Sequence, residues 1–218
     1  MDISVIVASE IAHLSQRRMG MTEDEVFKIF DEAGGVITNS HVELSGGKHT
    51  TGYIDKYAVY KNTEKVSLLC HAIAERFVND DVDVVIGPAR GGIPLSRQTA
   101  HHLRKLTARQ ILSVHADKSE DGKGFIIRST YSRLITGKRV LVVKDVLTTG
   151  RSTQLVVRAV GSVGGRVIGV GALCNRGDVT ARDLGVSKLE TLMNVTFHTW
   201  DKKDCPRCKE GIPLVEMP

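Results

Sequence analysis

Cysteine is scarce in this chain of 218 residues, which contains four in all. Two of them lie far from the others, so they do not form a disulfide framework, and a reducing cytoplasm is the expected compartment. No apolar run approaches the length that a membrane-spanning helix needs. The first residues, Met1-Asp2-Ile3-Ser4, lack the basic and apolar regions of a secretory signal, so we expect no signal peptide.

The chain also lacks a large excess of basic over acidic residues. Lys and Arg number 30 against 25 Asp and Glu, a formal net charge of +5. This mildly basic balance suits an anionic ligand, and it is too weak to indicate nucleic-acid binding. No helix-turn-helix pattern or basic cluster is recognisable. The length fits one domain with room for a small appendage, and it can bury a full hydrophobic core.

The hydrophobic pattern predicts strands and helices in alternation. Thr22 and Glu25 have capping-box spacing before a first helix that Gly34-Gly35 ends. Short strands and turns follow to Tyr60. Further helices are expected at 63–79, 93–106 and 152–160, strands at 82–86, 111–114, 139–143 and 167–173, and half of a hairpin at 125–128. This alternation predicts an α/β fold with a mostly parallel sheet covered on both faces. The stretch from Trp200 onward is polar and irregular.

The most informative stretch is residues 140–153, VLVVKDVLTTGRST. An apolar strand leads to Asp145, a loop of hydroxyl residues and glycine follows, and a helix begins. Such a loop directs backbone amides and the helix N-terminus at one point, which is the chemistry of a phosphate site. Walker A spacing and G-x-G-x-x-G are both absent, which argues against a P-loop NTPase and a dinucleotide site. An ordinary strand-to-helix turn capped by Thr and Ser is nearly as compatible with these residues alone.

This segment resembles the phosphoribosyl-pyrophosphate signature of type I phosphoribosyltransferases. The resemblance implies that Asp145 holds the ribose and acts in catalysis. The 5-phosphate would be held by Thr148, Thr149, Gly150, Arg151 and Ser152. Two positions depart from the family pattern: Lys144 replaces the first of two adjacent acidic residues, and Arg151 stands where a small residue is common. Lys144 would instead meet phosphate or a neighbouring carboxylate.

A second loop, residues 87–94 (GPARGGIP), resembles the pyrophosphate-binding loop of the same family. The resemblance implies that Ala89, Arg90 and Gly91 bind the substrate. Glycines after a strand leave backbone amides free, and a helix N-terminus follows. Taken alone, these residues are equally compatible with a plain Gly-Pro turn.

Three further segments resemble orotate phosphoribosyltransferases. Residues 35–49 and 53–56 look like the N-terminal hood of that group. Arg176 stands where the group carries an arginine for the orotate carboxylate, and Lys118 where it places a lysine that reaches the pyrophosphate. From the residues alone, Arg176 could equally be a surface ion-pair residue and Lys118 a solvated charge. The short acidic loop 119–124, followed by Arg128, resembles a subgroup that has a hairpin there.

The resemblance implies a type I phosphoribosyltransferase fold in one domain, with a hood segment at 1–60, an α/β core at 61–200 and a tail at 201–218. It also implies transfer of ribose 5-phosphate from phosphoribosyl pyrophosphate to orotate in pyrimidine nucleotide biosynthesis. Mg²⁺ would be bound through the pyrophosphate, and the enzyme would be a cytoplasmic homodimer with no membrane or nucleic-acid partner. A transferase acting on another base, or a phosphoribosyl-pyrophosphate-binding regulator with little catalysis, remain alternatives.

Cys205-Pro206-Arg207-Cys208 is a C-x-x-C pattern without a second copy. Zinc needs about four ligands, and candidate completions are His198, Asp201, Asp204 and Cys174. A structural turn is the favoured interpretation and zinc the second, so no metal ligand is assigned.

Overall fold

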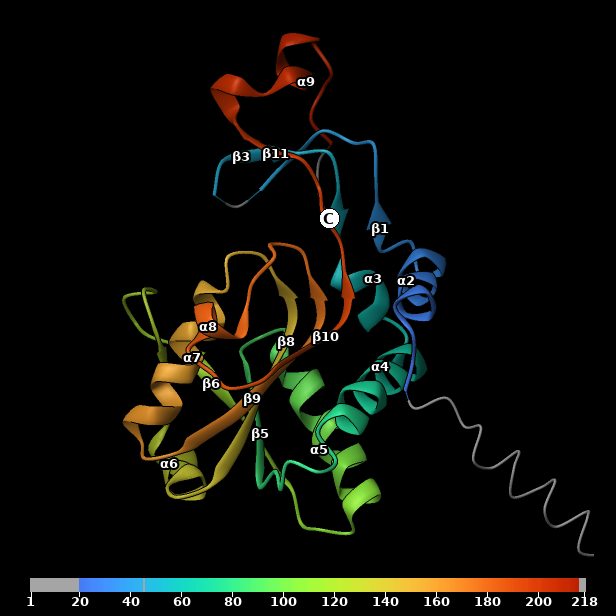
Figure 1. Cartoon of the computed structure of the whole chain (residues 1–218). Helices are drawn as coiled ribbons and strands as arrows, with labels where there is room; N and C mark the ends of the chain where they lie inside the picture. Colours follow the sequence, from blue (N-terminus) through green and yellow to red (C-terminus); the bar gives the residue numbers. More distant parts are fainter. Residues whose placement is uncertain (1–19, 45, 216–218) are drawn as a thin grey trace, which may run out of the picture.

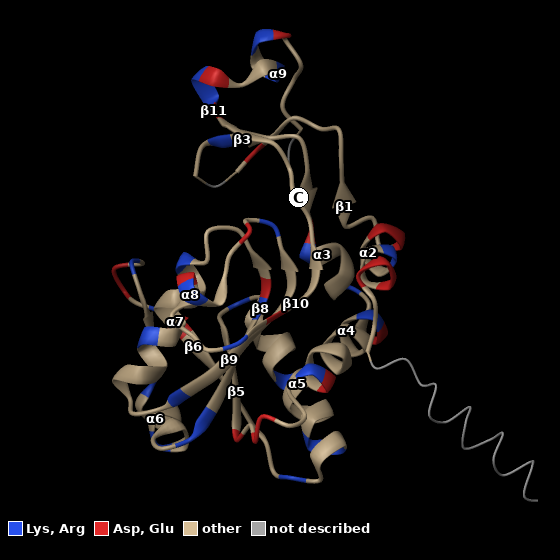
Figure 2. Ribbon diagram, in the orientation of Figure 1, with Lys and Arg blue, Asp and Glu red and all other residues tan. Residues whose placement is uncertain are grey.

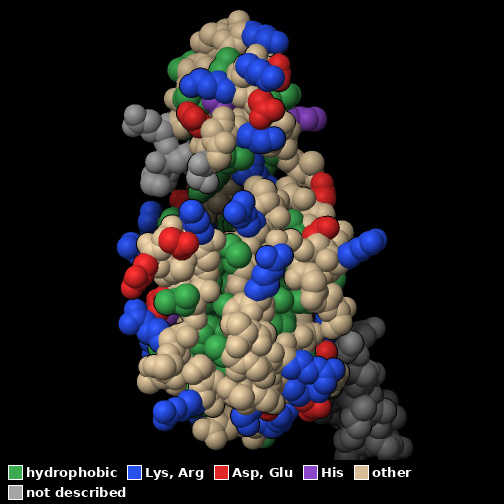
Figure 3. Space-filling model, turned by 90° about the vertical axis from the view of Figure 1, so that its left-hand side faces the viewer, with side chains coloured by type: hydrophobic (Ala, Val, Ile, Leu, Met, Phe, Trp, Pro, Cys, Tyr) green, Lys and Arg blue, Asp and Glu red, His purple; other side chains and the backbone are tan. Residues whose placement is uncertain are grey.

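The computed structural model describes residues 20–44 and 46–215, so the expectations drawn from Met1-Asp2-Ile3-Ser4 and Ser45 lie outside it. A layered α/β body carries a smaller hood, which stands above the sheet as a narrower lobe (Figures 1 and 3). Within the described residues, no helix is long and apolar enough to cross a membrane.

The body is built on one six-stranded sheet of order β10-β9-β8-β5-β6-β7. Its strands are β5 (Val84–Pro88), β6 (Leu112–Lys118), β7 (Phe125–Ile126), β8 (Arg139–Leu147), β9 (Arg166–Asn175) and β10 (Leu189–Asn194). All neighbours are parallel except β6 and β7, which form the predicted hairpin. The mostly parallel sheet predicted from the sequence is therefore confirmed.

Helices cover both faces of this sheet, as Figure 1 shows. They are α2 (Glu23–Glu32), α3 (Lys56–Tyr60), α4 (Thr63–Arg76), α5 (Gly92–Thr107), α6 (Ser129–Ile135), α7 (Arg151–Ser162) and α8 (Ala181–Leu184). Successive residues of β8 point to opposite faces, so Leu141 packs in the cluster with α4 and α5 while Val142 packs in the one with α6 and α7. The long apolar runs of the central strands follow from this burial on both sides.

Local sequence signals explain where several helices begin. The Thr22 hydroxyl caps α2 by accepting a hydrogen bond from the Glu25 amide. The Glu25 carboxylate in turn accepts one from the Thr22 amide, which confirms the predicted capping box. Asn62 caps α4 in a similar way. The helix expected at 63–79 is confirmed as α4, and Leu69, Ile73 and the following Phe77 are fully or almost fully buried.

The hood joins segments from both ends of the chain. Its strands are β1 (Val36–Ile37), β2 (Val42–Glu43), β3 (Lys48–Thr50), β4 (Tyr53–Ile54) and β11 (Thr199–Asp201). β1 pairs with β4, while β11 and β2 flank β3. The expectation that the chain is irregular from Trp200 onward is wrong, since Trp200 pairs with His49 across β11 and β3. A short 3₁₀ helix η1 (Lys202–Asp204) and helix α9 (Pro206–Lys209) follow.

The sequence pattern missed the shortest and least regular elements of the body. Helices α3 and α6 contain five and seven residues, too few for a clear helical period. Strand β10 reads LETLMN, without the β-branched run that marks β5 and β8. Its place at the sheet edge leaves half of its residues partly exposed.

Candidate active site

The two loops singled out in the sequence lie at the same edge of the sheet because they follow adjacent parallel strands. β5 ends in the loop at 89–91 that leads into α5, and β8 ends in the loop at 148–150 that leads into α7. Each helix N-terminus therefore points toward the region between the two loops. This is the position at the carboxyl ends of parallel strands where open α/β sheets bind ligands.

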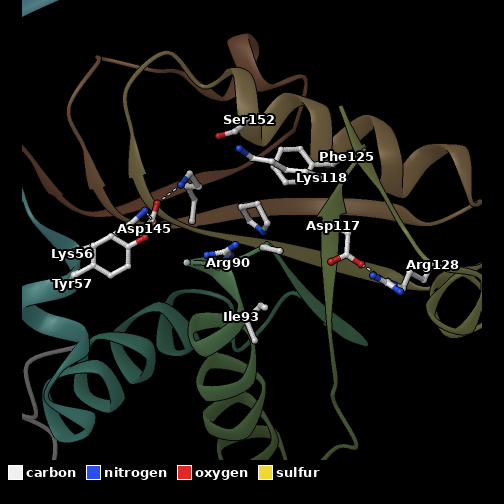
Figure 4. Close-up of a pocket in the computed structure, with 14 residues that line it drawn as sticks. Lys56, Tyr57, Arg90, Ile93, Asp117, Lys118, Phe125, Arg128, Asp145 and Ser152 are labelled. Atoms are coloured by element: carbon white, nitrogen blue, oxygen red, sulfur yellow. Dashed lines mark hydrogen bonds and ion pairs between the residues drawn. The ribbon is translucent and has the colours of Figure 1, made fainter. Parts of the chain in front are cut away.

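A cavity of about 710 Å³ opens between these loops, and Figure 4 shows the side chains around it. Its lining brings together residues from the loop at 89–91, from the end of β8, from the first turn of α7, from α3 and from the β6–β7 hairpin. They are Lys56, Tyr57, Pro88, Ala89, Arg90, Gly91, Ile93, Asp117, Lys118, Phe125, Arg128, Lys144, Asp145 and Ser152. Five cationic side chains face two carboxylates, so the cavity suits a ligand with several negative charges.

Asp145 is the buried carboxylate of this cavity, with about 1% of its surface exposed. Lys56 reaches its Oδ2 at 2.6 Å, and Lys144 contacts its Oδ1. Burial, the largest influence, raises the pKa of Asp145, but the charges and hydrogen bonds of Lys144 and Lys56 together lower it below its ordinary value. Asp145 is therefore an ionised carboxylate at neutral pH, held in place from two sides.

The loop at 89–91 passes so close to Asp145 that it requires glycine. A Cβ added to Gly91 would lie 2.4 Å from Asp145 Oδ2 and 3.3 Å from Lys56 Nζ. Tyr60 fixes the loop further by donating from its hydroxyl to the Gly91 carbonyl at 2.9 Å. The Ala89–Arg90 peptide bond in this loop is cis. Ala89 and Arg90 both line the cavity.

The β6–β7 hairpin supplies the opposite wall. Asp117 and Lys118 end β6, and Arg128 donates from Nε to Asp117 Oδ2 at 2.5 Å (Figure 4). This contact raises the pKa of the Arg128 guanidinium through its hydrogen bond to Asp117. Lys118 is exposed and lines the cavity, so its ammonium is available to an anion.

The loop before α7 lines a second, adjoining cavity of about 470 Å³ together with the hairpin tip. Thr149, Arg151 and Ser152 face it, and Ser152 lies in the lining of both cavities. Gly150 adopts a φ of +71°, and an added Cβ would lie 2.9 Å from Leu184 Cδ2. Thr148 is exposed, and neither Thr148 nor Gly150 belongs to the lining of these two cavities.

Arg176 lies outside both cavity linings, at the junction of body and hood. Its backbone amide donates to the Leu147 carbonyl, which places it at the same sheet edge as the loop at 148–150. Its Nη2 donates to Thr50 Oγ1 at 2.9 Å, and its guanidinium stacks 5.4 Å from the Phe197 ring centre. Burial lowers the pKa of its guanidinium below the ordinary arginine value. The interpretation of Arg176 as an exposed surface ion-pair residue is therefore wrong.

Four cavity residues have no role that the sequence predicted: Lys56, Tyr57, Asp117 and Phe125. Lys56 sits directly after Asp55, which caps α3 by accepting from the Tyr57 amide at 2.8 Å. This Asx-type cap is a signal of a helix N-terminus that the sequence contains. Nothing in the sequence reveals the ion pair between Lys56 and Asp145. Asp117 carries no signal of its own beyond standing next to Lys118.

The proposed completions of the C-x-x-C pair were wrong. Cys174 lies in the body core, and His198 is exposed and stacks on Trp200. Asp201 and Asp204 are exposed and do not belong to the group of possible ligands around Cys205 and Cys208. The side chains that meet Cys205 and Cys208 are instead His41 and His49 in the hood. Both precede the pair by more than 150 residues, so local spacing could not identify them.

The family model of the phosphoribosyl transferase domain matches residues 57–199, which include both loops and the whole six-stranded sheet. The chain belongs to the phosphoribosyltransferase family. It is 38% identical to an orotate phosphoribosyltransferase of Desulforamulus reducens over 90% of this chain and 96% of that protein. The type I fold and the expected family are thus confirmed.

Solved structures agree with this assignment. The orotate phosphoribosyltransferase of Mycobacterium tuberculosis in complex with Fe(III) dicitrate superposes with a TM-score of 0.61 at 26% identity, over 78% of this chain and 96% of that one. The same enzyme in complex with 5-phospho-α-D-ribosyl 1-diphosphate gives a TM-score of 0.53 at 26% identity, over 65% and 80% of the two chains.

Proposed function

We propose that this protein transfers ribose 5-phosphate from phosphoribosyl pyrophosphate to orotate, giving orotidine 5′-phosphate and pyrophosphate. The observation that carries this proposal is one cavity in which the loop at 89–91 and the N-terminal turn of α7 lie beside a buried carboxylate, Asp145. The orotate phosphoribosyltransferases to which the chain is similar supply the identity of the acceptor base.

The loops divide the substrate between them in this proposal. The loop at 148–152 and the adjoining cavity take the 5-phosphate, and Ala89, Arg90 and Gly91 take the pyrophosphate. Asp145 accepts from the ribose hydroxyls between these two anions. Lys118 approaches the pyrophosphate from the hairpin, and Lys144 and Lys56 hold Asp145 ionised. The contribution of each residue is therefore positioning and charge stabilisation.

The transfer itself requires no nucleophile from the protein. The bond between ribose C1 and the pyrophosphate oxygen breaks, pyrophosphate leaves with that electron pair, and an orotate ring nitrogen bonds to C1 and loses its proton. Lys118 and Arg90, which line the cavity, would stabilise the oxygens that gain negative charge. Electrostatic stabilisation of such developing charge commonly lowers an enzymatic barrier more than any other single effect.

Mg²⁺ is the proposed cofactor, and the residues present fit a metal carried mainly by the substrate. The two carboxylates of the cavity, Asp117 and Asp145, are each engaged by basic side chains. Mg²⁺ commonly keeps few protein ligands and takes the remainder from substrate phosphates and water. Bound in this way, it would add positive charge to the leaving pyrophosphate.

The decisive experiment mixes the protein with Mg²⁺, phosphoribosyl pyrophosphate and orotate and follows the loss of orotate absorbance. We expect turnover that depends on both substrates, with one pyrophosphate released for each orotate consumed. Turnover of adenine, guanine, hypoxanthine or uracil in place of orotate would transfer the proposal to another base.

A regulator with little catalysis is the second candidate, and Lys144 favours it. Lys144 and Lys56 occupy both oxygens of Asp145, so ribose hydroxyls must compete with two ammonium groups. Calorimetry separates the two functions: a regulator binds phosphoribosyl pyrophosphate without turnover of any base. Lys and Arg lie over hood and body with Asp and Glu among them, which does not favour a nucleic-acid surface (Figure 2).

A further inference from the structure

The centre of the hood contains a cluster of two histidines and two cysteines from three separate segments. His41 directly precedes β2, His49 lies in β3, and Cys205 and Cys208 belong to the turn and helix of α9. One ligand atom from each residue lies within 4.8 Å of all the others. His41, His49 and Cys205 are buried, and Cys208 is on the exposed side.

The distances in this cluster approach those of a tetrahedral metal shell. His41 Nε2 lies 3.4 Å from Cys205 Sγ and 3.6 Å from Cys208 Sγ, and His49 Nδ1 lies 3.2 Å from Cys208 Sγ. Donor atoms bound to one tetrahedral zinc ion, with bonds of about 2.0 Å to nitrogen and 2.3 Å to sulfur, lie about 3.3–3.8 Å apart. The two ring nitrogens, at 2.8 Å, need to separate by only about 0.5 Å to fit.

The surroundings of His41 select the ring tautomer that a metal requires. Its Nδ1 lies 2.7 Å from the Ile212 carbonyl oxygen, which can only accept a hydrogen bond. Nδ1 therefore carries the proton, and in the neutral ring Nε2 presents its lone pair to the cluster. A metal-bound histidine commonly donates from its other nitrogen to a carbonyl in this way. His49 makes its polar contacts through Nδ1, inside the cluster.

The hood has little apolar material at its centre among the described residues. Of its strands, only β1 and β4 contribute to the two hydrophobic clusters, through Val36 and Ile54, whereas the buried Val42 of β2 belongs to neither cluster. Cys205 is also fully buried outside both clusters. Small units with too few apolar residues are commonly stabilised by a structural metal instead.

We propose that His41, His49, Cys205 and Cys208 bind a structural zinc ion that forms the centre of the hood. Two imidazole and two thiolate ligands are a set that zinc prefers, and four protein ligands leave no open position for catalysis. The site is separate from the sheet-edge cavity, whose lining includes none of these residues.

This zinc site also bears on the base end of the active site, an inference that rests on the proposed function. His49 and Thr50 are neighbours in β3, and Thr50 Oγ1 accepts from Arg176 Nη2. Zinc thus fixes the strand that positions Arg176. Loss of the metal should weaken orotate use, while the loops that hold phosphoribosyl pyrophosphate, which belong to the body, should be unaffected.

The first test is the metal content of the full-length protein. After growth with added zinc and gel filtration, elemental analysis should give about one zinc per chain. Exchange with Co²⁺ should give intense visible bands of tetrahedral cobalt together with thiolate-to-cobalt charge transfer. A C205S/C208S double variant should lose the zinc and the bands. C70A and H198Q, which change a cysteine and a histidine outside the cluster, should keep both.

Three results would overturn the proposal: wild-type protein that takes up no zinc, zinc retained by C205S/C208S, or zinc lost equally by the controls. The first would leave a metal-free cluster in which His49 Nδ1–H donates to His41 Nε2. The kinetic arm compares zinc-loaded and chelated protein, and we expect a rise of several-fold in the KM for orotate with an unchanged Kd for phosphoribosyl pyrophosphate. Zinc binding without orotate turnover would reject the proposed function and retain the metal site.

Discussion

Lys56 Nζ and Asp145 Oδ2, 2.6 Å apart, link the first residue of α3 to the end of β8 across 89 positions of sequence. Burial lowers the pKa of Lys56, but the nearby Asp145 charge and hydrogen bond raise it overall. Both groups are therefore charged at neutral pH. The pair fixes the carboxylate at the floor of the cavity, directly against the Gly91 backbone.

Replacing this carboxylate should nearly abolish activity. In Asp145→Asn the ribose hydroxyls lose a charged acceptor, and we expect kcat/KM for the proposed reaction to fall by about a hundredfold or more. Circular dichroism should be unchanged, since the amide keeps the shape of the side chain. A variant that is folded and retains most of its activity would contradict the role of Asp145.

A methyl group at Gly91 should disturb the same pair. Its Cβ would lie 2.4 Å from Asp145 Oδ2, so Gly91→Ala must displace the carboxylate or the loop, and we expect kcat/KM to fall by about tenfold or more. Gly161→Ala is the matched control, because its Cβ meets nothing within 4 Å. This control should retain activity and gain up to about 1 kcal/mol of stability in α7. Equal activity in both variants would refute the steric argument.

Arg176 should favour orotate over bases without a carboxylate by binding the orotate carboxylate. A charged hydrogen-bonded pair of this kind contributes roughly 1.5–3 kcal/mol, so Arg176→Ala should reduce orotate use by about ten- to a hundredfold or more. Steady-state kinetics measure this loss, and calorimetry should show phosphoribosyl-pyrophosphate binding little changed. Intact orotate kinetics, or equal weakening of both ligands, would favour another base.

The protein should be a homodimer. The family resemblance implies a site near a dimer interface, so light scattering at micromolar concentration should give twice the chain mass of 23.8 kDa. A monomer at all concentrations tested would count against this expectation.

His102 should make stability depend on pH below neutrality. Burial, assisted by the neighbours His71, His101 and Lys105, lowers its pKa from 6.5 to about 4, against a weaker opposing hydrogen bond to Ser67. Between these values the unfolded chain binds a proton that the folded protein excludes, so this contribution is present above pH 6.5 and is lost as the pH falls toward 4. His102→Gln should flatten the slope of Tm against pH in that window. An unchanged slope would rule His102 out as its source.

The sequence predicted the parts of the fold that depend on local pattern. Apolar runs located β5 and β8. The hydroxyl-rich loop before α7 indicated a candidate phosphate site, although an ordinary capped turn was nearly as compatible with the same residues. Lys56 could not be assigned, because its contact with Asp145 arises only when α3 packs beside the sheet edge. His41 and His49 were missed for a similar reason, since strand pairing brings them to Cys205 and Cys208. Contacts between segments that are distant in sequence produce no local pattern from which they could be predicted.

The pairing of β11 with β3 has a consequence for the order of folding. Residues 199–201 close a sheet whose other strands lie at 42–50, so every strand of the body is synthesised before the hood can be completed. Pairings between such distant segments form slowly, and partly synthesised chains commonly fold by units from the N-terminal side. During translation, β3 therefore lacks its β11 partner, and keeps one edge unpaired, until all strands of the body have been synthesised.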